Sequence, residues 1–97
     1  MADYKLSGAA DQDSDRLYEY SLLEFGERVS DVYLDGLFHR FELLAEHPDW
    51  GNDYGHIAPG LRRYEHKSHS IYYLCSSERQ ILIVRVLGRR QDPGNHL

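Results

Sequence analysis

Residues 61–87, LRRYEHKSHSIYYLCSSERQILIVRVL, decide the fold because three strand-like segments follow one another along them. The segments 61–66, 70–75 and 81–87 are rich in β-branched and aromatic residues, which favour strands. The polar connections 67–69 and 76–80 are short enough for hairpins. This stretch therefore predicts an antiparallel meander of three strands.

Alternation along the last of these strands assigns its side chains to two faces. Leu82, Val84 and Val86 are expected on one side, and Ile81, Ile83, Arg85 and Leu87 on the other. One face of the sheet should pack against helices. The opposite face, which carries Arg85, is expected to be partly solvated.

Two helices are predicted upstream of the meander. Apolar residues recur at spacings of three and four between residues 9 and 25, and again between residues 33 and 45. Ser7 is the predicted N-cap of the first helix, Gly26 its end, and Pro48 the stop of the second. Two antiparallel helices joined at a glycine form a helical hairpin.

The remaining segments complete a single domain over residues 1–97. Residues 3–7 alternate like a short strand, and residues 48–60 are a loop rich in Gly, Pro, Asn and Asp. The tail, about residues 88–97, is expected to be extended and mobile. The predicted fold class is α+β, a two-layer domain in which a helical hairpin packs on a small, mainly antiparallel sheet.

Composition narrows the class of protein. The chain of 97 residues has a net charge of −5, which argues against a generic polyanion binder. It has no apolar run long enough to span a bilayer, no secretory leader and a single cysteine, Cys75, so a cytoplasmic protein without membrane contact is expected.

Charge is divided unevenly along the chain. Residues 1–53 carry four basic and thirteen acidic side chains, and residues 54–97 carry seven basic and three acidic ones. This division is compatible with two faces that bind different partners, or with solvated acidic helices beside ordinary basic sheet edges.

Motifs for chemistry are weak. The six histidines lack the spacing of a metal site, and no glycine-rich phosphate loop or nucleophile turn occurs, so no metal, cofactor or catalytic residue is predicted from them. The basic side chains of the second half are more informative, because clustered arginines bind carboxylates and phosphates. Separate surface ion pairs are the alternative interpretation. The arginines in question are Arg62, Arg63, Arg85, Arg89 and Arg90.

The order of short motifs along nearly the whole chain is more specific than any one of them. The set includes Tyr4-Lys5-Leu6-Ser7, Pro59-Gly60-Leu61-Arg62, Ser68-His69-Ser70-Ile71-Tyr72-Tyr73 and Ile83-Val84-Arg85-Val86-Leu87, followed by Arg89-Arg90 and Asp92. With these motifs the chain resembles the ParE toxins of bacterial type II toxin-antitoxin pairs, within the wider ParE/RelE superfamily. Gly88 departs from the pattern, since the family commonly has histidine there, so no histidine chemistry carries over.

This resemblance implies a growth-inhibiting toxin that acts on DNA gyrase and is neutralised by a ParD-type antitoxin encoded beside it. Contact with operator DNA would then be indirect, through the antitoxin. An antitoxin segment that folds on binding should lie across the helical hairpin and reach the sheet edge. The expected antitoxin contacts are Leu17, Tyr18, Leu22, Tyr33 and Leu37, with Arg62, Arg63 and Arg85 for its acidic residues. Packing of the apolar positions on the sheet alone is the competing interpretation, above all for Leu37.

Toxicity is expected to depend on Arg85, Arg89 and Arg90, at the end of the last strand and the start of the tail. Mutual surface pairing of the tail charges is the competing explanation. The alternative activity is that of a RelE-like, ribosome-dependent messenger endoribonuclease. In that case Tyr64 or His69 would move protons, and the phosphate-stabilising residues would be Arg62, Arg63, Arg85 and Arg89.

Overall fold

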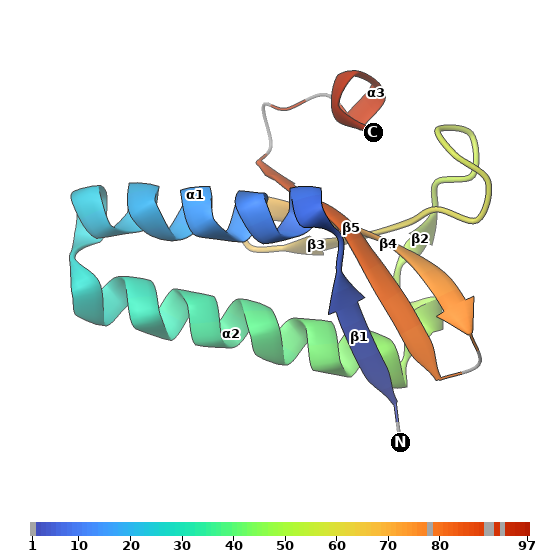
Figure 1. Ribbon diagram of the computed structural model, residues 1–97, viewed down its shortest axis with the longest axis horizontal. Helices are drawn as coiled ribbons and strands as arrows, with labels where there is room; N and C mark the ends of the chain where they lie inside the picture. Colours follow the sequence, from blue (N-terminus) through green and yellow to red (C-terminus); the bar gives the residue numbers. More distant parts are fainter. Residues whose placement is uncertain (1, 78, 89–90, 92) are drawn as a thin grey trace.

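The computed structural model describes residues 2–77, 79–88, 91 and 93–97, and it has two layers (Figure 1). The helical layer comprises α1 (Gly8–Phe25) and α2 (Glu27–Glu46). The sheet contains β1 (Asp3–Leu6), β2 (Asn52–Asp53), β3 (Arg62–His66), β4 (His69–Ser77) and β5 (Gln80–Gly88), in the order β1-β5-β4-β3-β2. A 3-10 turn, η1 (Pro48–Trp50), follows α2, and a short helix, α3 (Pro93–His96), lies near the C-terminus. The predicted class and element order are confirmed.

The helical hairpin begins and ends where the sequence predicts. Ser7 Oγ accepts a hydrogen bond from the Ala10 amide at 3.0 Å and donates one to the Val84 carbonyl at 2.7 Å, so it caps α1 and fixes that end on β5. Gly26 has a φ of 83° between the two helices, a conformation that glycine adopts without steric cost. Ser30 Oγ joins Ser21 Oγ at 2.7 Å inside the hairpin.

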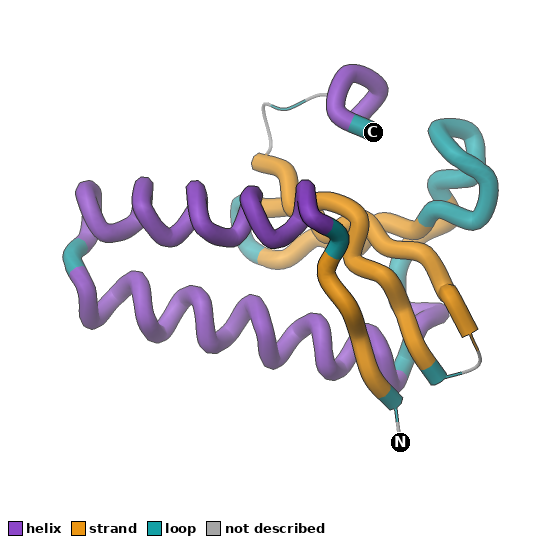
Figure 2. Tube along the Cα trace, in the orientation of Figure 1, coloured by secondary structure: helices purple, strands orange, loops and turns teal. Residues whose placement is uncertain are grey.

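The sheet combines antiparallel and parallel strand pairs. The three strands β3, β4 and β5 form the predicted antiparallel meander, while β1 pairs with β5 in parallel. Figure 2 shows the hairpin extending away from the strands on the side of its turn. None of the helices within the described ranges is long and apolar enough to cross a membrane.

The face assignment for β5 was wrong for Ile81 and Ile83 and also for Val84, which packs on the opposite face from Val86. Tyr72 lies opposite Arg85 and Tyr73 opposite Ile83, so Val84 is an extra residue that interrupts the alternation, as in a β-bulge. Ile81 and Ile83 therefore belong to the core under the helices. This main core is completed by Ala10, Leu37, Phe41, Leu44, Ala45, Ile71, Tyr73 and Val86.

The other face of the sheet is also covered in part. Leu61, Tyr72 and Leu87 are buried there beneath side chains from residues 54–58. The segment predicted as a plain loop thus contains η1 and the two residues of β2, and it closes this second cluster. This face of the sheet is therefore less exposed to solvent than the presence of Arg85 in the sequence predicted.

The tail is not extended where it is described. Gly88 and Gln91 bond to each other, and Pro93–His96 form α3. Arg85 Nη1 donates to the His96 carbonyl at 2.7 Å, which holds α3 near the end of β5.

Candidate partner-binding site

The turn end of the helical hairpin exposes large apolar side chains. Leu23 is 87% exposed and Val32 67%, and three more of this kind lie close by in the sequence: Tyr20, Phe25 and Val29. Contiguous apolar surface on a small protein marks a site of interaction with another molecule. The hydrophobic pattern placed these residues on helices but gave no reason for their exposure.

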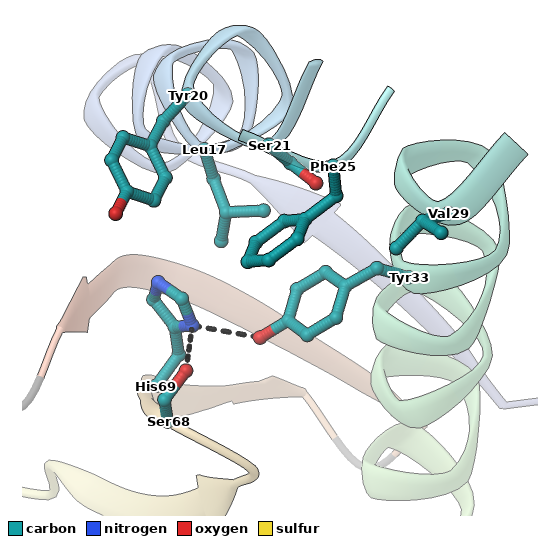
Figure 3. Close-up of a pocket in the computed structure, with 8 residues that line it drawn as sticks. All are labelled: Leu17, Tyr20, Ser21, Phe25, Val29, Tyr33, Ser68 and His69. Carbon is teal, nitrogen blue, oxygen red and sulfur yellow. Dashed lines mark hydrogen bonds between the residues drawn. The ribbon is translucent and has the colours of Figure 1, made fainter. Parts of the chain in front are cut away.

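A cavity of about 180 Å³ lies beside this apolar surface, between α1, α2 and the β3–β4 turn (Figure 3). Its lining residues are Leu17, Tyr20, Ser21, Phe25, Val29, Tyr33, Ser68 and His69. A second cavity of about 200 Å³ shares Leu17, Tyr20 and His69 with it. A third of about 360 Å³ shares Val29 and Tyr33. The three shallow cavities together form one surface depression, here called the hairpin groove.

Polar groups gather at one point of this groove. Tyr33 Oη lies 2.7 Å from His69 Nδ1, and Ser68 Oγ lies 3.3 Å from the same nitrogen (Figure 3). Lys67 Nζ sits 5.3 Å from the centre of the Tyr33 ring. Burial lowers the pKa of His69 and raises the pKa of Tyr33, so both groups are neutral near pH 7.

Of the five apolar residues predicted to contact a partner, two line the groove and three lie outside its lining. Leu17 and Tyr33 line the groove, whereas Tyr18 and Leu22 are half-buried outside its lining. The Tyr18 hydroxyl donates to Asp31 Oδ1 at 2.6 Å across the hairpin. Leu37 was a wrong choice, because its exposure is 0% and its side chain belongs to the core.

Arg62 and Arg63 of the predicted arginine cluster are both hydrogen-bonded to other groups of the chain. Arg62 Nη1 donates to the Gly51 carbonyl at 2.7 Å. Arg63 bonds Glu65 Oε1 at 2.6 Å and Ser70 Oγ at 3.2 Å. Arg62 is thus bonded to the segment between η1 and β2 and Arg63 to groups of the sheet, while Arg89 and Arg90 lie outside the described residues.

Arg85 is bound more firmly still. Its Nε and Nη2 each donate to an Asp13 carboxylate oxygen at 2.8 Å, and the side chains are 15% and 6% exposed. Asp13 also accepts from the Val86 amide at 3.0 Å. The hydrogen bonds to Asp13 raise the pKa of Arg85. Its guanidinium therefore joins α1 to β5 and offers little to an outside partner.

The residues of the alternative ribonuclease site are hydrogen-bonded to other groups of the chain. Tyr64 Oη accepts from Arg40 Nη1 at 3.5 Å, and His69 bonds Tyr33 and Ser68. In the described part of the chain, no hydrogen bond joins Tyr64 or His69 to the predicted arginines, and no metal-binding group of acidic, histidine or cysteine side chains occurs. What the arrangement offers is an apolar groove with a polar centre, suited to binding a chain segment.

Comparison with known proteins agrees with this fold. Residues 4–93 match the family model described as "ParE toxin of type II toxin-antitoxin system, parDE". Toxin ParE1 of Mycobacterium tuberculosis is 31% identical over 94 residues, 97% of this chain and 96% of the relative. Toxin ParE1 of Caulobacter vibrioides is 31% identical over 97 residues, 100% of this chain and 99% of the relative. A solved structure of the "Chromosomal ParDE TA system from P. aeruginosa" superposes with a TM-score of 0.73 at 19% identity, covering 91% of this chain and 96% of that one.

Proposed function

Because the chain belongs to the ParE family of type II toxin-antitoxin toxins, we propose that its hairpin groove binds a ParD-type antitoxin and that the free toxin inhibits DNA gyrase in the cytoplasm. The observation that carries the antitoxin assignment is the groove itself, with its rim of exposed apolar side chains on α1 and α2.

The chemistry of the groove favours an amphipathic helix as the bound segment. Leu17, Phe25 and Val29 form apolar walls, and side chains at helical spacing on a partner can fill the space between them. A disordered segment that folds on binding can cover such a surface while it orders. The similar fold in the solved ParDE system from P. aeruginosa supports this choice of partner.

Family membership supports gyrase as the target. The competing ribonuclease would need cations aimed at a scissile phosphate. Arg62, Arg63 and Arg85 instead donate to groups of their own chain, which favours inhibition by binding over RNA cleavage.

Induction of the toxin in a bacterial host tests this function. We expect growth arrest with DNA breaks and impaired supercoiling, intact messenger RNA, and recovery of growth when the neighbouring antitoxin gene is co-expressed. Supercoiling is measured on plasmid DNA and message integrity by primer extension in the same culture. Cleaved messages with normal supercoiling would establish the ribonuclease alternative instead.

A further inference from the structure

His69 gives the apolar hairpin groove a directed hydrogen-bond donor. The hydroxyls of Tyr33 and Ser68 both lie within 3.3 Å of its Nδ1. In the tautomer whose Nδ1 carries no proton, both hydroxyls can donate to this nitrogen, and the proton of the neutral ring then lies on Nε2; the proposal below uses this tautomer.

The Nε2 atom faces the part of the groove that a partner would fill. In Figure 3 the second ring nitrogen points away from Tyr33, toward the α1 side where Leu17 and Tyr20 lie. His69 lines both the central cavity and the adjoining one that contains Arg16. Among the hydrogen bonds of the described residues, all those of the His69 ring use Nδ1.

The surroundings of this donor are electropositive. Arg16 lines the second cavity together with His69, and Arg28 and Lys67 line the third cavity together with Tyr33. In the part of the chain that the structure describes, the one carboxylate that lines the groove is Asp13, which Arg85 holds with two hydrogen bonds of 2.8 Å. An acidic group is thus attracted to the groove although the chain has a net charge of −5.

We propose that His69 Nε2 binds a carboxylate of the antitoxin helix, and that Tyr33 is the positioning residue that holds the ring for this contact. The inference rests on the proposed function and names the chemistry of its contact. The occupant is an amphipathic helix whose otherwise apolar face carries one Asp or Glu at the level of His69. That carboxylate helps to set the register of the helix, because the contact of the ring with Tyr33 holds the His69 donor at a fixed place in the groove.

This contact makes antitoxin binding dependent on pH. Burial lowers the pKa of His69 in the free toxin, and a neighbouring carboxylate raises it in the complex. The complex therefore takes up a proton, and affinity rises as pH falls from about 8 toward 6. The Tyr33 hydroxyl can accept from a protonated Nδ1 as readily as it donates to a bare one.

Other groups around His69 do not account for this dependence. The pKa of His66 is also lowered by burial, but the side chain is 8% exposed and does not line the groove. Burial raises the pKa of Tyr33, so its hydroxyl stays neutral throughout this pH range. The charged and titratable groups that face the imidazole are Asp13, Arg16 and Tyr20 from α1, Tyr33 from α2, and His66 and Lys67 from β3 and its turn.

Calorimetric titration of the toxin with its neighbouring antitoxin at about pH 6 and about pH 8 tests the proposal. Wild type should bind at least roughly threefold more tightly at the lower pH. His69→Gln should weaken binding about tenfold at the lower pH, or about 1.4 kcal/mol, and remove the pH dependence. Tyr33→Phe should reduce both the affinity at the lower pH and the pH dependence of binding. His39→Gln, on an exposed part of α2, is the matched control and should behave as wild type.

The antitoxin provides a second set of variants that does not depend on how the toxin variants fold. Changing its acidic residues one at a time to amides should reveal one substitution that removes the pH dependence with wild-type toxin. Equal affinity of His69→Gln and wild type at both pH values overturns the proposal. A loss of affinity in His69→Gln that is the same at both pH values overturns it too. So does the absence of any such acidic residue. Failure of wild-type toxin to bind the antitoxin overturns the proposed function as well, which separates the two claims.

Discussion

At the scale of single residues, the pair of Asp13 and Arg85 connects the two layers of the molecule. Asp13 lies in the second turn of α1, and its carboxylate accepts from both the Arg85 side chain and the Val86 amide. Both side chains are largely withdrawn from water, so loss of one partner leaves a buried charge without compensation. The arginine that resembles a binding residue in sequence is a structural one in this fold.

Replacement of Asp13 by alanine should therefore lower the free energy of unfolding by about 3 kcal/mol, measured by urea denaturation. The matched control is Glu65→Ala, which removes the carboxylate partner of Arg63. Glu65 is 64% exposed, and this control should cost less than about 1 kcal/mol. Similar losses in the two variants would show that the buried pair has no special role.

At the scale of elements, Tyr73 of β4 positions the segment that follows α2. Its hydroxyl donates to the Pro48 carbonyl and accepts from the Gly51 amide, both at 2.8 Å. A Cβ at Gly51 would collide with the Tyr73 ring, which is fully buried and has no space to move. Glycine is required here for close approach, not for an unusual backbone angle.

Substitutions at Gly51 and Gly36 test overpacking and helix propensity separately. Gly51→Ala should destabilise the fold by about 1–3 kcal/mol through overpacking. Gly36→Ala, in the middle of α2 with open space beside it, should stabilise the fold by about 0.5–1 kcal/mol through helix propensity. Thermal unfolding of both variants measures the difference, and a stable Gly51→Ala protein would disprove the proposed collision.

Sequence patterns predicted the elements better than their connections. Ser7, Gly26 and Pro48 mark helix ends through local chemistry, and the meander follows from runs of β-branched and aromatic residues. The bulge at Val84 depends on packing between strands, so alternation within β5 alone assigned the wrong face to two isoleucines. The contact between Asp13 and Arg85 spans 72 residues, and no local pattern indicates it.

The site was predictable only in part, because it also depends on contacts between segments that are distant in the sequence. Leu17 and Tyr33 lie on helical stripes that suggest apolar contact, but the groove forms where these stripes meet the β3–β4 turn. His69 was noticed as a possible proton carrier, not as part of a binding surface. The role proposed for it rests on a contact that only the fold creates, since Tyr33 lies 36 residues away in the sequence and 2.7 Å away in the structure.

At the scale of the whole molecule, the two-layer arrangement separates stability from recognition. The core lies where the helices cover the sheet, and the turn end of the hairpin projects beyond it with apolar side chains exposed (Figure 1). If the proposed function holds, substitutions at that end should change antitoxin binding without disturbing the core. A toxin that must be both stable and reversibly neutralised benefits from this separation.

Growth of cells that express toxin variants, with and without the antitoxin, tests the central claim most directly. Val29→Asp places a charge in the groove at the start of α2, where the helix dipole tolerates it, and His39→Asp places one on an exposed part of α2 outside the groove lining. Wild type and His39→Asp should arrest growth alone and be neutralised by the antitoxin, whereas Val29→Asp should arrest growth in both conditions. Full neutralisation of Val29→Asp would contradict the assignment of the hairpin groove to the antitoxin.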